Sequence, residues 1–117
     1  MDSQNLFLAL FGAIVCFTIY KSFQRKKVMK MLRQVDLKAA QIIDVRSKSE
    51  FSSGSFPGSI NIPLEALQSS FKKLNINKQI LVCCASGARS SMAKRILHKG
   101  GAKDVHNIGA WHTLLSI

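Results

Sequence analysis

Residues 79–90 read QILVCCASGARS, and this stretch decides the fold. Its first part, Gln79–Cys83, has the length, the apolar character and the branched side chains of a strand buried in a parallel sheet. Small residues follow, and the chain then favours a helix over Ser91–Lys99 that Gly100 and Gly101 end. A strand, a short loop and a helix in this order are the repeating unit of an α/β fold.

The same alternation of strands and helices continues on both sides of this unit. Further strands are predicted at Gln41–Val45, Ser59–Ile62 and Asp104–Ile108, and helices at Val28–Gln41, Leu64–Leu74 and after Gly109–Ala110. Parallel strands need such crossover helices between them. The sequence therefore predicts an α/β domain with an open, mostly parallel sheet flanked by helices.

The loop after the best predicted strand has the composition of an anion site. Cys84 stands just past the strand, where ligands bind in open α/β sheets. Ser86, Gly87 and Ala88 are small, so successive backbone N–H groups can point inward as a nest. The helix N-terminus and Arg89 add positive charge. These features predict a lowered pKa and a nucleophilic thiolate at Cys84; the alternative is a buried, inert cysteine.

Four motifs in a fixed order make the chain resemble the rhodanese family. The loop Cys84–Ser90 is similar to the family's C-x-x-G-x-R-S active-site pattern. The second is Ile42–Arg46 with Glu50-Phe51 (D-V-R…E-F/Y), and the third is Gly54–Pro63 (G-H-I-P-G-A-I-N-I-P). The fourth consists of Gly101–Val105 and Asn107–Gly109, which resemble the run that ends in a Gly-Gly-Trp-like turn. The resemblance covers roughly residues 40–112, with the four motifs in the correct order.

The resemblance implies a fold, a reaction and a site. The fold is a five-stranded parallel sheet flanked by helices. In the reaction, Cys84 attacks the outer sulfur of thiosulfate or another sulfane donor and becomes a persulfide, and a thiol or protein acceptor then removes that sulfur. The backbone amides that would cradle the persulfide and the small anionic donor belong to Ala85, Ser86, Gly87, Ala88, Arg89 and Ser90. No metal or organic cofactor is needed.

Two positions depart from the family pattern, and two charged residues support the site. Ser55 replaces the usual His, and Ala110 replaces the second Gly near the C-terminus; both substitutions are interpreted as structural. Asp44 and Arg46 follow a predicted strand. We expect Arg46 to bridge to Glu50 in an ion pair that fixes the loop, and the alternative is a role in substrate access.

The remaining reactive side chains are interpreted as structural. Cys83 alternates with Cys84 along the strand, so it should point to the opposite face and belong to the core rather than act as a resolving thiol. The three histidines, at positions 98, 106 and 112, have no metal-ligand spacing with one another or with the cysteines, and surface positions are expected for them. Trp111 is expected to pack in the core.

The N-terminal run Leu6–Tyr20 contains fifteen residues without a charge and predicts a membrane anchor. As a helix this run is about 22 Å long, and its neighbours extend the apolar segment to residues 5–23. A cleaved signal peptide would need basic residues before the run, whereas Asp2 precedes it and Lys21 follows it. A buried core helix is disfavoured because every face is apolar.

Charge and cysteine content place the domain relative to the membrane. Basic residues cluster after the span, so the positive-inside tendency keeps the domain on the cytoplasmic side of a single-pass chain. Cys16, Cys83 and Cys84 have no disulfide framework, which agrees with a reducing compartment. The predicted organisation is an anchor with a basic juxtamembrane segment over residues 1–26 and a rhodanese-like domain over residues 27–117.

The formal net charge of +11 favours anionic partners: a phospholipid surface, a nucleic acid or a small anionic substrate. It is spread along the chain, with +5 in residues 1–35 and +6 in residues 36–117. Nucleic-acid binding is disfavoured, because one Trp and one Tyr form no stacking motif. Apolar residues make up 47% of the 117 positions, which indicates one small folded domain.

Two other function classes stay open beside sulfur transfer. Cell-cycle dual-specificity phosphatases resemble rhodaneses in fold, but five residues separate Cys and Arg in their loop. Here four residues intervene, Ala85 to Ala88, and a tighter nest suits a single sulfur better than a phosphate ester. The second alternative is a non-catalytic rhodanese-like module that docks or regulates a partner at the membrane; the presence of Cys84 argues against it.

Overall fold

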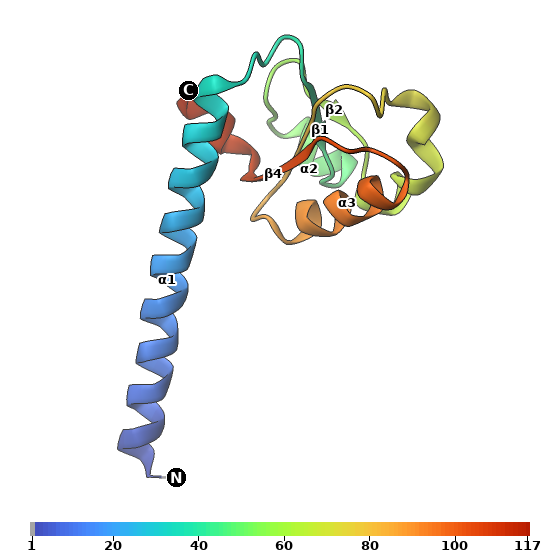
Figure 1. The fold of residues 1–117 in the computed structure, drawn as a ribbon. Coiled ribbons are helices and arrows are strands. Elements are labelled where there is room, and N and C mark those ends of the chain that lie inside the picture. Colours follow the sequence, from blue (N-terminus) through green and yellow to red (C-terminus); the bar gives the residue numbers. More distant parts are fainter. Residues whose placement is uncertain (1) are drawn as a thin grey trace.

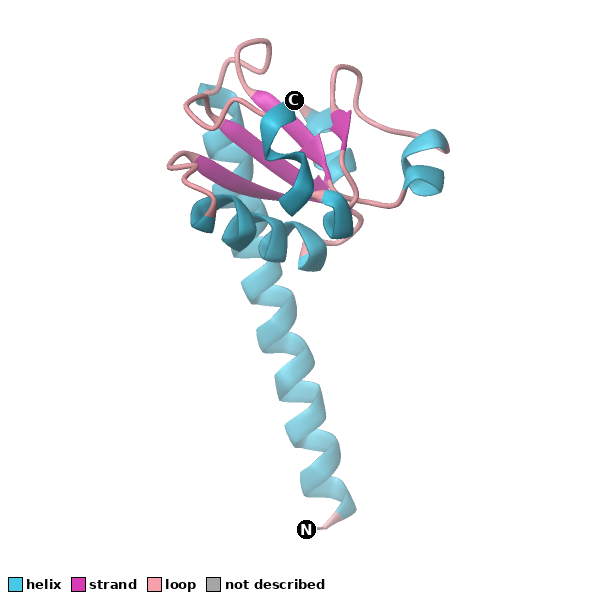
Figure 2. Cartoon of the chain, turned by 90° about the vertical axis from the view of Figure 1, so that its right-hand side faces the viewer, coloured by secondary structure: helices cyan, strands magenta, loops and turns pink. Residues whose placement is uncertain are grey.

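A computed structural model describes residues 2–117 of the chain. Its centre is a parallel sheet of four strands in the order β2-β1-β3-β4 (Figures 1 and 2). The strands are β1 (Gln41–Asp44), β2 (Ile60–Asn61), β3 (Ile80–Cys84) and β4 (Val105–Ala110). The α/β class with a parallel sheet flanked by helices is confirmed.

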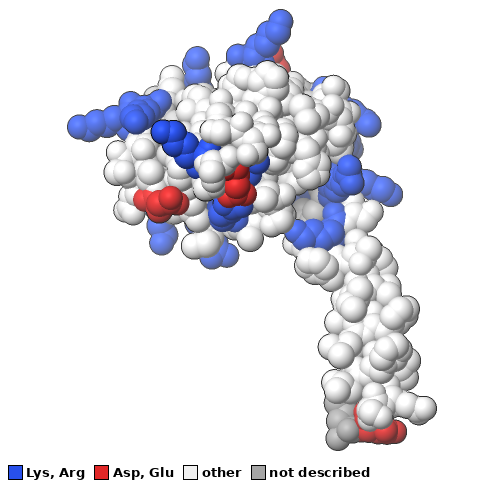
Figure 3. Space-filling model, turned by 180° about the vertical axis from the view of Figure 1, so that it is seen from behind, with Lys and Arg blue, Asp and Glu red and all other residues white. Residues whose placement is uncertain are grey.

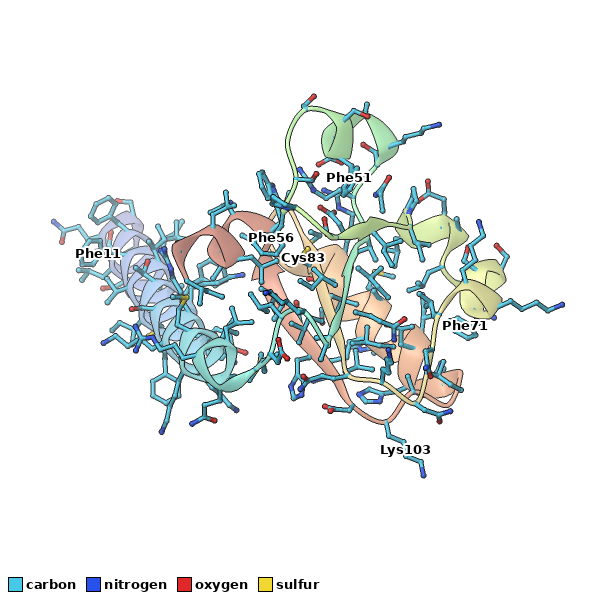
Figure 4. All side chains as sticks on the ribbon, turned by 90° about the horizontal axis from the view of Figure 1, so that it is seen from above. Phe11, Phe51, Phe56, Phe71, Cys83 and Lys103 are labelled. Carbon is cyan, nitrogen blue, oxygen red and sulfur yellow. The ribbon has the colours of Figure 1, made fainter. Side chains whose placement is uncertain are left out.

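The first helix, α1 (Ser3–Gln34), is a single helix of 32 residues. Its N-terminal part projects away from the sheet, with Phe11 on the free portion (Figures 1 and 4). Every residue from Ser3 to Phe23 is exposed, whereas Leu32 near the other end is buried. Within the described residues, α1 is the one helix long and apolar enough to cross a bilayer.

β3 organises the core because all five of its residues are buried. Alternate side chains point to opposite faces of a sheet. Ile80, Val82 and Cys84 therefore join one hydrophobic cluster, and Leu81 and Cys83 join another. The sheet thus separates two cores, each of which needs its own cover.

Different elements cover the two faces of the sheet. One cluster lies under α3 (Ala88–Lys99) and the 3₁₀ helices η1 (Leu64–Ala66) and η2 (Gln68–Lys73). The other is closed by the last turns of α1 and by η3 (Trp111–Ser116). The end of α1 is therefore a packing element of the domain as well as its link to the apolar run.

A short helix, α2 (Lys48–Ser52), follows β1 and is fixed at its start by a capping box. The Ser47 hydroxyl accepts from the Glu50 amide at 3.2 Å, and the Glu50 carboxylate accepts from the Ser47 amide at 3.2 Å. Each group satisfies a donor that the helix end leaves free. The capping box fixes the backbone at Glu50, which takes part in the site below.

Several predicted elements have different bounds in the structure. The expected fifth strand is absent from residues 2–117, because the chain ahead of β1 forms α1 and a short turn. The separate helix expected at Val28–Gln41 is wrong: no Gly or Pro interrupts the chain from Ala13 to Gln34, so α1 continues to Gln34. β3 and β4 extend to Cys84 and Ala110, and α3 begins at Ala88 rather than Ser91.

The predicted helix over Leu64–Leu74 is two 3₁₀ helices instead. The hydroxyls of Ser69 and Ser70 both donate to the Ala66 carbonyl, at 3.0 and 2.7 Å. Hydroxyls that bond to nearby carbonyls compete with the regular α-helical ladder. The spacing of the apolar residues therefore predicted correctly which side chains pack on the core. It predicted the helix type wrongly.

Candidate active site

The sulfur of Cys84 lies at the carboxyl end of β3, where the chain turns into the loop before α3. The residue is only 1% exposed. The Gly87 amide donates to the sulfur at 2.9 Å, and the Ser90 hydroxyl lies 3.4 Å from it. The loop therefore wraps its backbone around the thiol, as its small residues predicted.

Gly87 makes this wrapping possible. Its backbone is left-handed, with φ +110°, and it is the N-cap residue of α3. A Cβ added there would lie 3.4 Å from the Cα of Gly109. A residue with a side chain would be strained in this conformation. Ala110, by contrast, has φ −71°, which any residue adopts. The alanine that stands here in place of the family's second glycine therefore causes no backbone strain.

The loop stabilises the charged form of Cys84. Burial opposes ionisation and on its own raises the pKa. Hydrogen bonds from the Ser90 side chain and from the amides of Ser90, Gly87 and Ser86 outweigh burial and hold the pKa of Cys84 below its ordinary value of 9.0. A buried thiolate with such donors is a nucleophile.

Ser90 is held in turn by a residue that the sequence did not single out. The Ser90 hydroxyl lies 2.6 Å from the Asn107 side-chain oxygen and 3.1 Å from the Gly87 carbonyl. The Asn107 oxygen also accepts from the Gly109 amide at 2.9 Å, and its amide group donates to the Gly87 carbonyl at 3.4 Å. Asn107 thus ties β4 to the Cys84 loop, and the only hint in the sequence was its place in the Asn107–Gly109 motif.

Arg89 is oriented by an acidic residue from α2. Its guanidinium forms a two-point ion pair with the Glu50 carboxylate, with N–O distances of 2.7 and 3.0 Å. Both side chains are more than one third exposed. The hydrogen bonds from Arg89, followed by those from Ser47, lower the pKa of Glu50 to about 2. Arg89 is therefore a cation held in place next to the Cys84 loop, and its side chain is 37% exposed.

The predicted bridge between Arg46 and Glu50 is wrong. Arg46 pairs with Asp44 at 2.8 Å, both buried, and reaches only the backbone carbonyl of Glu50, at 3.4 Å. It also donates to the Gly54 carbonyl at 2.7 Å and stacks on the Trp111 ring at 4.7 Å. Charged groups this deeply buried need several partners at once, so Asp44 and Arg46 brace the loop that carries Glu50.

A contact from α1 also reaches the loop. The Lys21 ammonium donates to the Ser86 carbonyl at 3.4 Å, across 65 residues of sequence. No local pattern could have predicted this contact. Of the predicted segment, Gly87 and Ser90 contact the Cys84 sulfur, and Ala85, Ser86 and Ala88 are exposed at the loop surface.

The other reactive residues lie elsewhere. Cys83 is fully buried on the opposite face of β3, in the centre of the domain (Figure 4), as expected. Desolvation by burial, with the Asp44 charge, raises its pKa to about 12. His98 and His112 are exposed as expected, and His106 pairs with Asp104 at 2.7 Å. Residues 2–117 hold no group of three or more His, Cys, Asp or Glu placed to bind a metal.

Comparisons with known proteins agree with this geometry. The rhodanese-like domain family matches residues 25–112. Uncharacterized protein YqhL of Bacillus subtilis is 30% identical over 110 residues, which cover 91% of this chain and 87% of that protein. Thiosulfate sulfurtransferase GlpE of Shewanella oneidensis is 27% identical over 95 residues, which cover 78% and 94%.

A solved structure from E. coli, described as rhodanese with anions, has a TM-score of 0.61 at 31% identity and covers 64% of this chain and 91% of its own. The matched family segment begins inside α1 and ends after β4, so it includes the sheet, the Cys84 loop and the packed end of α1. Distant relatives include thiosulfate sulfurtransferases. The chain belongs to the family of rhodanese-like domains.

Proposed function

We propose that this chain is a membrane-anchored sulfurtransferase that carries sulfane sulfur on Cys84. The observation that supports this most directly is the buried Cys84 sulfur, which accepts a hydrogen bond from the Gly87 amide at 2.9 Å. Its lowered pKa supplies the thiolate that the chemistry needs. The names of distant relatives favour the same reaction class.

Sulfur transfer then proceeds in two displacements. The Cys84 thiolate attacks the outer sulfur of thiosulfate, the S–S bond of the donor breaks, and sulfite leaves with the bonding electron pair. A thiol or protein acceptor attacks the terminal sulfur of the Cys84 persulfide, and the Cys84 thiolate leaves. The amides of Ser86, Gly87 and Ser90 stabilise anionic sulfur in both steps, as backbone donors do in oxyanion holes. No cofactor takes part in this scheme.

The phosphatase alternative receives less support. Its cysteine–arginine loop has one residue more, and here the short loop directs the Gly87 amide onto the sulfur itself. A non-catalytic docking module would not need a cysteine of lowered pKa at this position. Both alternatives predict that Cys84 does not accumulate sulfur, so one experiment separates them from the proposal.

Residues 1–26 are assigned to the anchor and residues 27–117 to the catalytic domain. Ser3 to Phe23 are exposed, and the apolar side chains among them are ones that water disfavours and a bilayer accepts. The basic residues that follow put the domain on the cytoplasmic side, where the three free thiols stay reduced. The division falls inside α1, just before Val28, where packing on the domain begins.

The test is the intact mass of the full chain in detergent after incubation with thiosulfate. A gain of one sulfur atom, removed by cyanide and absent in Cys84→Ser, is the expected result. Cys16→Ser is the matched control, because Cys16 is an exposed thiol on α1. A folded, reduced chain that gains no sulfur from thiosulfate or another sulfane donor would refute the assignment.

A further inference from the structure

The uncharged run of α1 ends beside the catalytic loop. Lys21 closes that run, and its ammonium donates to the Ser86 carbonyl at 3.4 Å. A Cβ built on Gly87 would lie 4.0 Å from the same nitrogen. A lysine at the end of a membrane span lies at the headgroup level. In the anchored chain proposed above, the loop that holds Cys84 therefore lies level with the bilayer surface.

α3 lies on the side of the domain from which the free part of α1 projects (Figures 1 and 2). Its inner face is buried against the sheet through Ser90, Ala93 and Leu97. The opposite face is exposed at helical spacing and consists of Ala88, Ser91, Met92, Arg95, His98 and Lys99. This outer face of α3 is directed toward the level of the apolar run, and Met92 is 55% exposed on it.

The part of α1 after Tyr20 and the whole of α3, which lie nearest to the expected bilayer surface, carry only positive charges. α1 contains six Lys or Arg after Tyr20 and no acidic residue, and α3 contains Arg89, Lys94, Arg95 and Lys99 and no acidic residue. Of the domain's acids, Asp44 and Glu50 are paired with arginines. Figure 3 shows basic side chains where α1 meets the domain and a white, uncharged surface over most of the rest of α1.

We propose that the outer face of α3 and the basic part of α1 form one surface that binds anionic phospholipid headgroups. Clustered Lys and Arg beside a span are attracted to anionic lipids, and the exposed Met92 can contact the upper acyl region. The anchor keeps α3 close to the bilayer, so a weak contact suffices. This docking rests on the anchor assignment made under the proposed function, and it makes the Cys84 loop accessible from the membrane surface.

The test places a fluorescent reporter on α3 in the full chain. Met92→Trp is compared with Lys72→Trp, an exposed site on η2 away from α1. Both proteins retain Trp111, which contributes the same background. Each is reconstituted into vesicles of phosphatidylcholine alone or of an equimolar mixture with phosphatidylglycerol. Lipids brominated near the headgroup end of the acyl chain quench tryptophan that lies at the bilayer surface.

The expected result is that the Met92→Trp reporter is quenched at least about twofold more than the Lys72→Trp reporter in the anionic vesicles. This difference in quenching shrinks in phosphatidylcholine alone, because those vesicles carry no net negative charge. It also shrinks at salt of about 0.5 M, because salt screens the attraction. The triple change Lys94→Glu, Arg95→Glu and Lys99→Glu in the Met92→Trp background removes it. Equal quenching at both sites, or a difference that ignores lipid charge and salt, overturns the docking surface and leaves α3 free for a protein.

The same samples separate this proposal from the sulfur chemistry. Persulfide formation on Cys84 is measured by mass after addition of thiosulfate. Selective quenching without persulfide contradicts sulfur transfer and supports docking, whereas persulfide without selective quenching contradicts docking alone. A chain that does not enter the vesicles at all contradicts the anchor and the docking surface together.

Discussion

Cys83 and Cys84 are adjacent in one strand and almost equally buried, yet they have opposite chemistry. Cys83 is 0% exposed and Cys84 is 1% exposed. Burial raises the pKa of Cys83 to about 12, whereas the loop holds the pKa of Cys84 below 9.0. Removal from water disfavours both thiolates. The difference therefore comes from the faces on which the two sulfurs lie.

The Cys83 face is closed by apolar side chains from α1 and η3. The Cys84 face opens at the end of the strand onto backbone amides and the Ser90 hydroxyl. Both faces of β3 contribute to a hydrophobic core, but only the sulfur of Cys84 lies next to the amides of the loop that follows the strand. Hydrogen-bond donors, rather than exposure, therefore account for the lower pKa of Cys84.

The largest effect on activity is expected when Cys84 and Cys83 are each replaced in a separate variant. Cys84→Ser removes the nucleophile, so kcat/KM for thiosulfate falls at least about 1000-fold. Cys83→Ala leaves a small apolar cavity, costs about 1 kcal/mol of unfolding free energy and retains activity. Steady-state kinetics and denaturant unfolding of both variants measure this. Loss of activity in Cys83→Ala with a normal unfolding curve would contradict the division between the faces.

A substitution on the Cys83 face of β3 should lower the stability of the fold without changing the pKa of Cys84. Leu32, at the packed end of α1, is 1% exposed and belongs to the Cys83 cluster. Leu32→Ala should lower the free energy of unfolding by about 2–5 kcal/mol. The pH midpoint for alkylation of Cys84 should stay at its wild-type position. A shifted midpoint would show that the two faces are coupled.

A substitution on the Cys84 face should instead change the pKa of Cys84 and the rate of sulfur transfer. A hydrogen bond to a charged group contributes about 1.5–3 kcal/mol, so Ser90→Ala should lower kcat/KM at least about 10-fold at neutral pH. The alkylation midpoint of Cys84 should rise, since a donor to its thiolate is lost. In the wild type that midpoint lies below 9.0, and Cys83 stays unreactive until pH about 12. An unchanged midpoint in Ser90→Ala would mean that the backbone amides alone set the pKa.

The smallest effect concerns the cation beside the loop. Glu50→Gln removes the ionic partner of Arg89, and the looser guanidinium should raise KM for thiosulfate about threefold with little change in kcat. The pKa of Glu50 is lowered from 4.5 to about 2, so the pair's contribution to stability is complete above pH 4.5 and disappears as pH falls through about 2. The variant's effect should therefore be the same from pH 5 to 9. A KM ratio that varies across this range would contradict the assignment.

The site departs from sequence-based expectation where partners are distant along the chain. Glu50 was expected to pair with Arg46, four residues away, but its carboxylate pairs with Arg89, 39 residues away. Ser90 and Asn107 are separated by 17 residues and meet because β4 pairs with β3, the strand that leads into the loop before Ser90. Spacing in the sequence cannot reveal which of several charged groups become neighbours after folding.

The sequence by itself determined the local features: the buried strand before Cys84, the small-residue loop, the helix after it and the uncharged run of α1. These follow from side-chain size, polarity and backbone freedom within a few residues. The tertiary structure alone decided that α1 runs unbroken into the domain, that four strands form the sheet, and that Lys21 touches Ser86. Such contacts depend on the packing of distant segments, which no local pattern encodes.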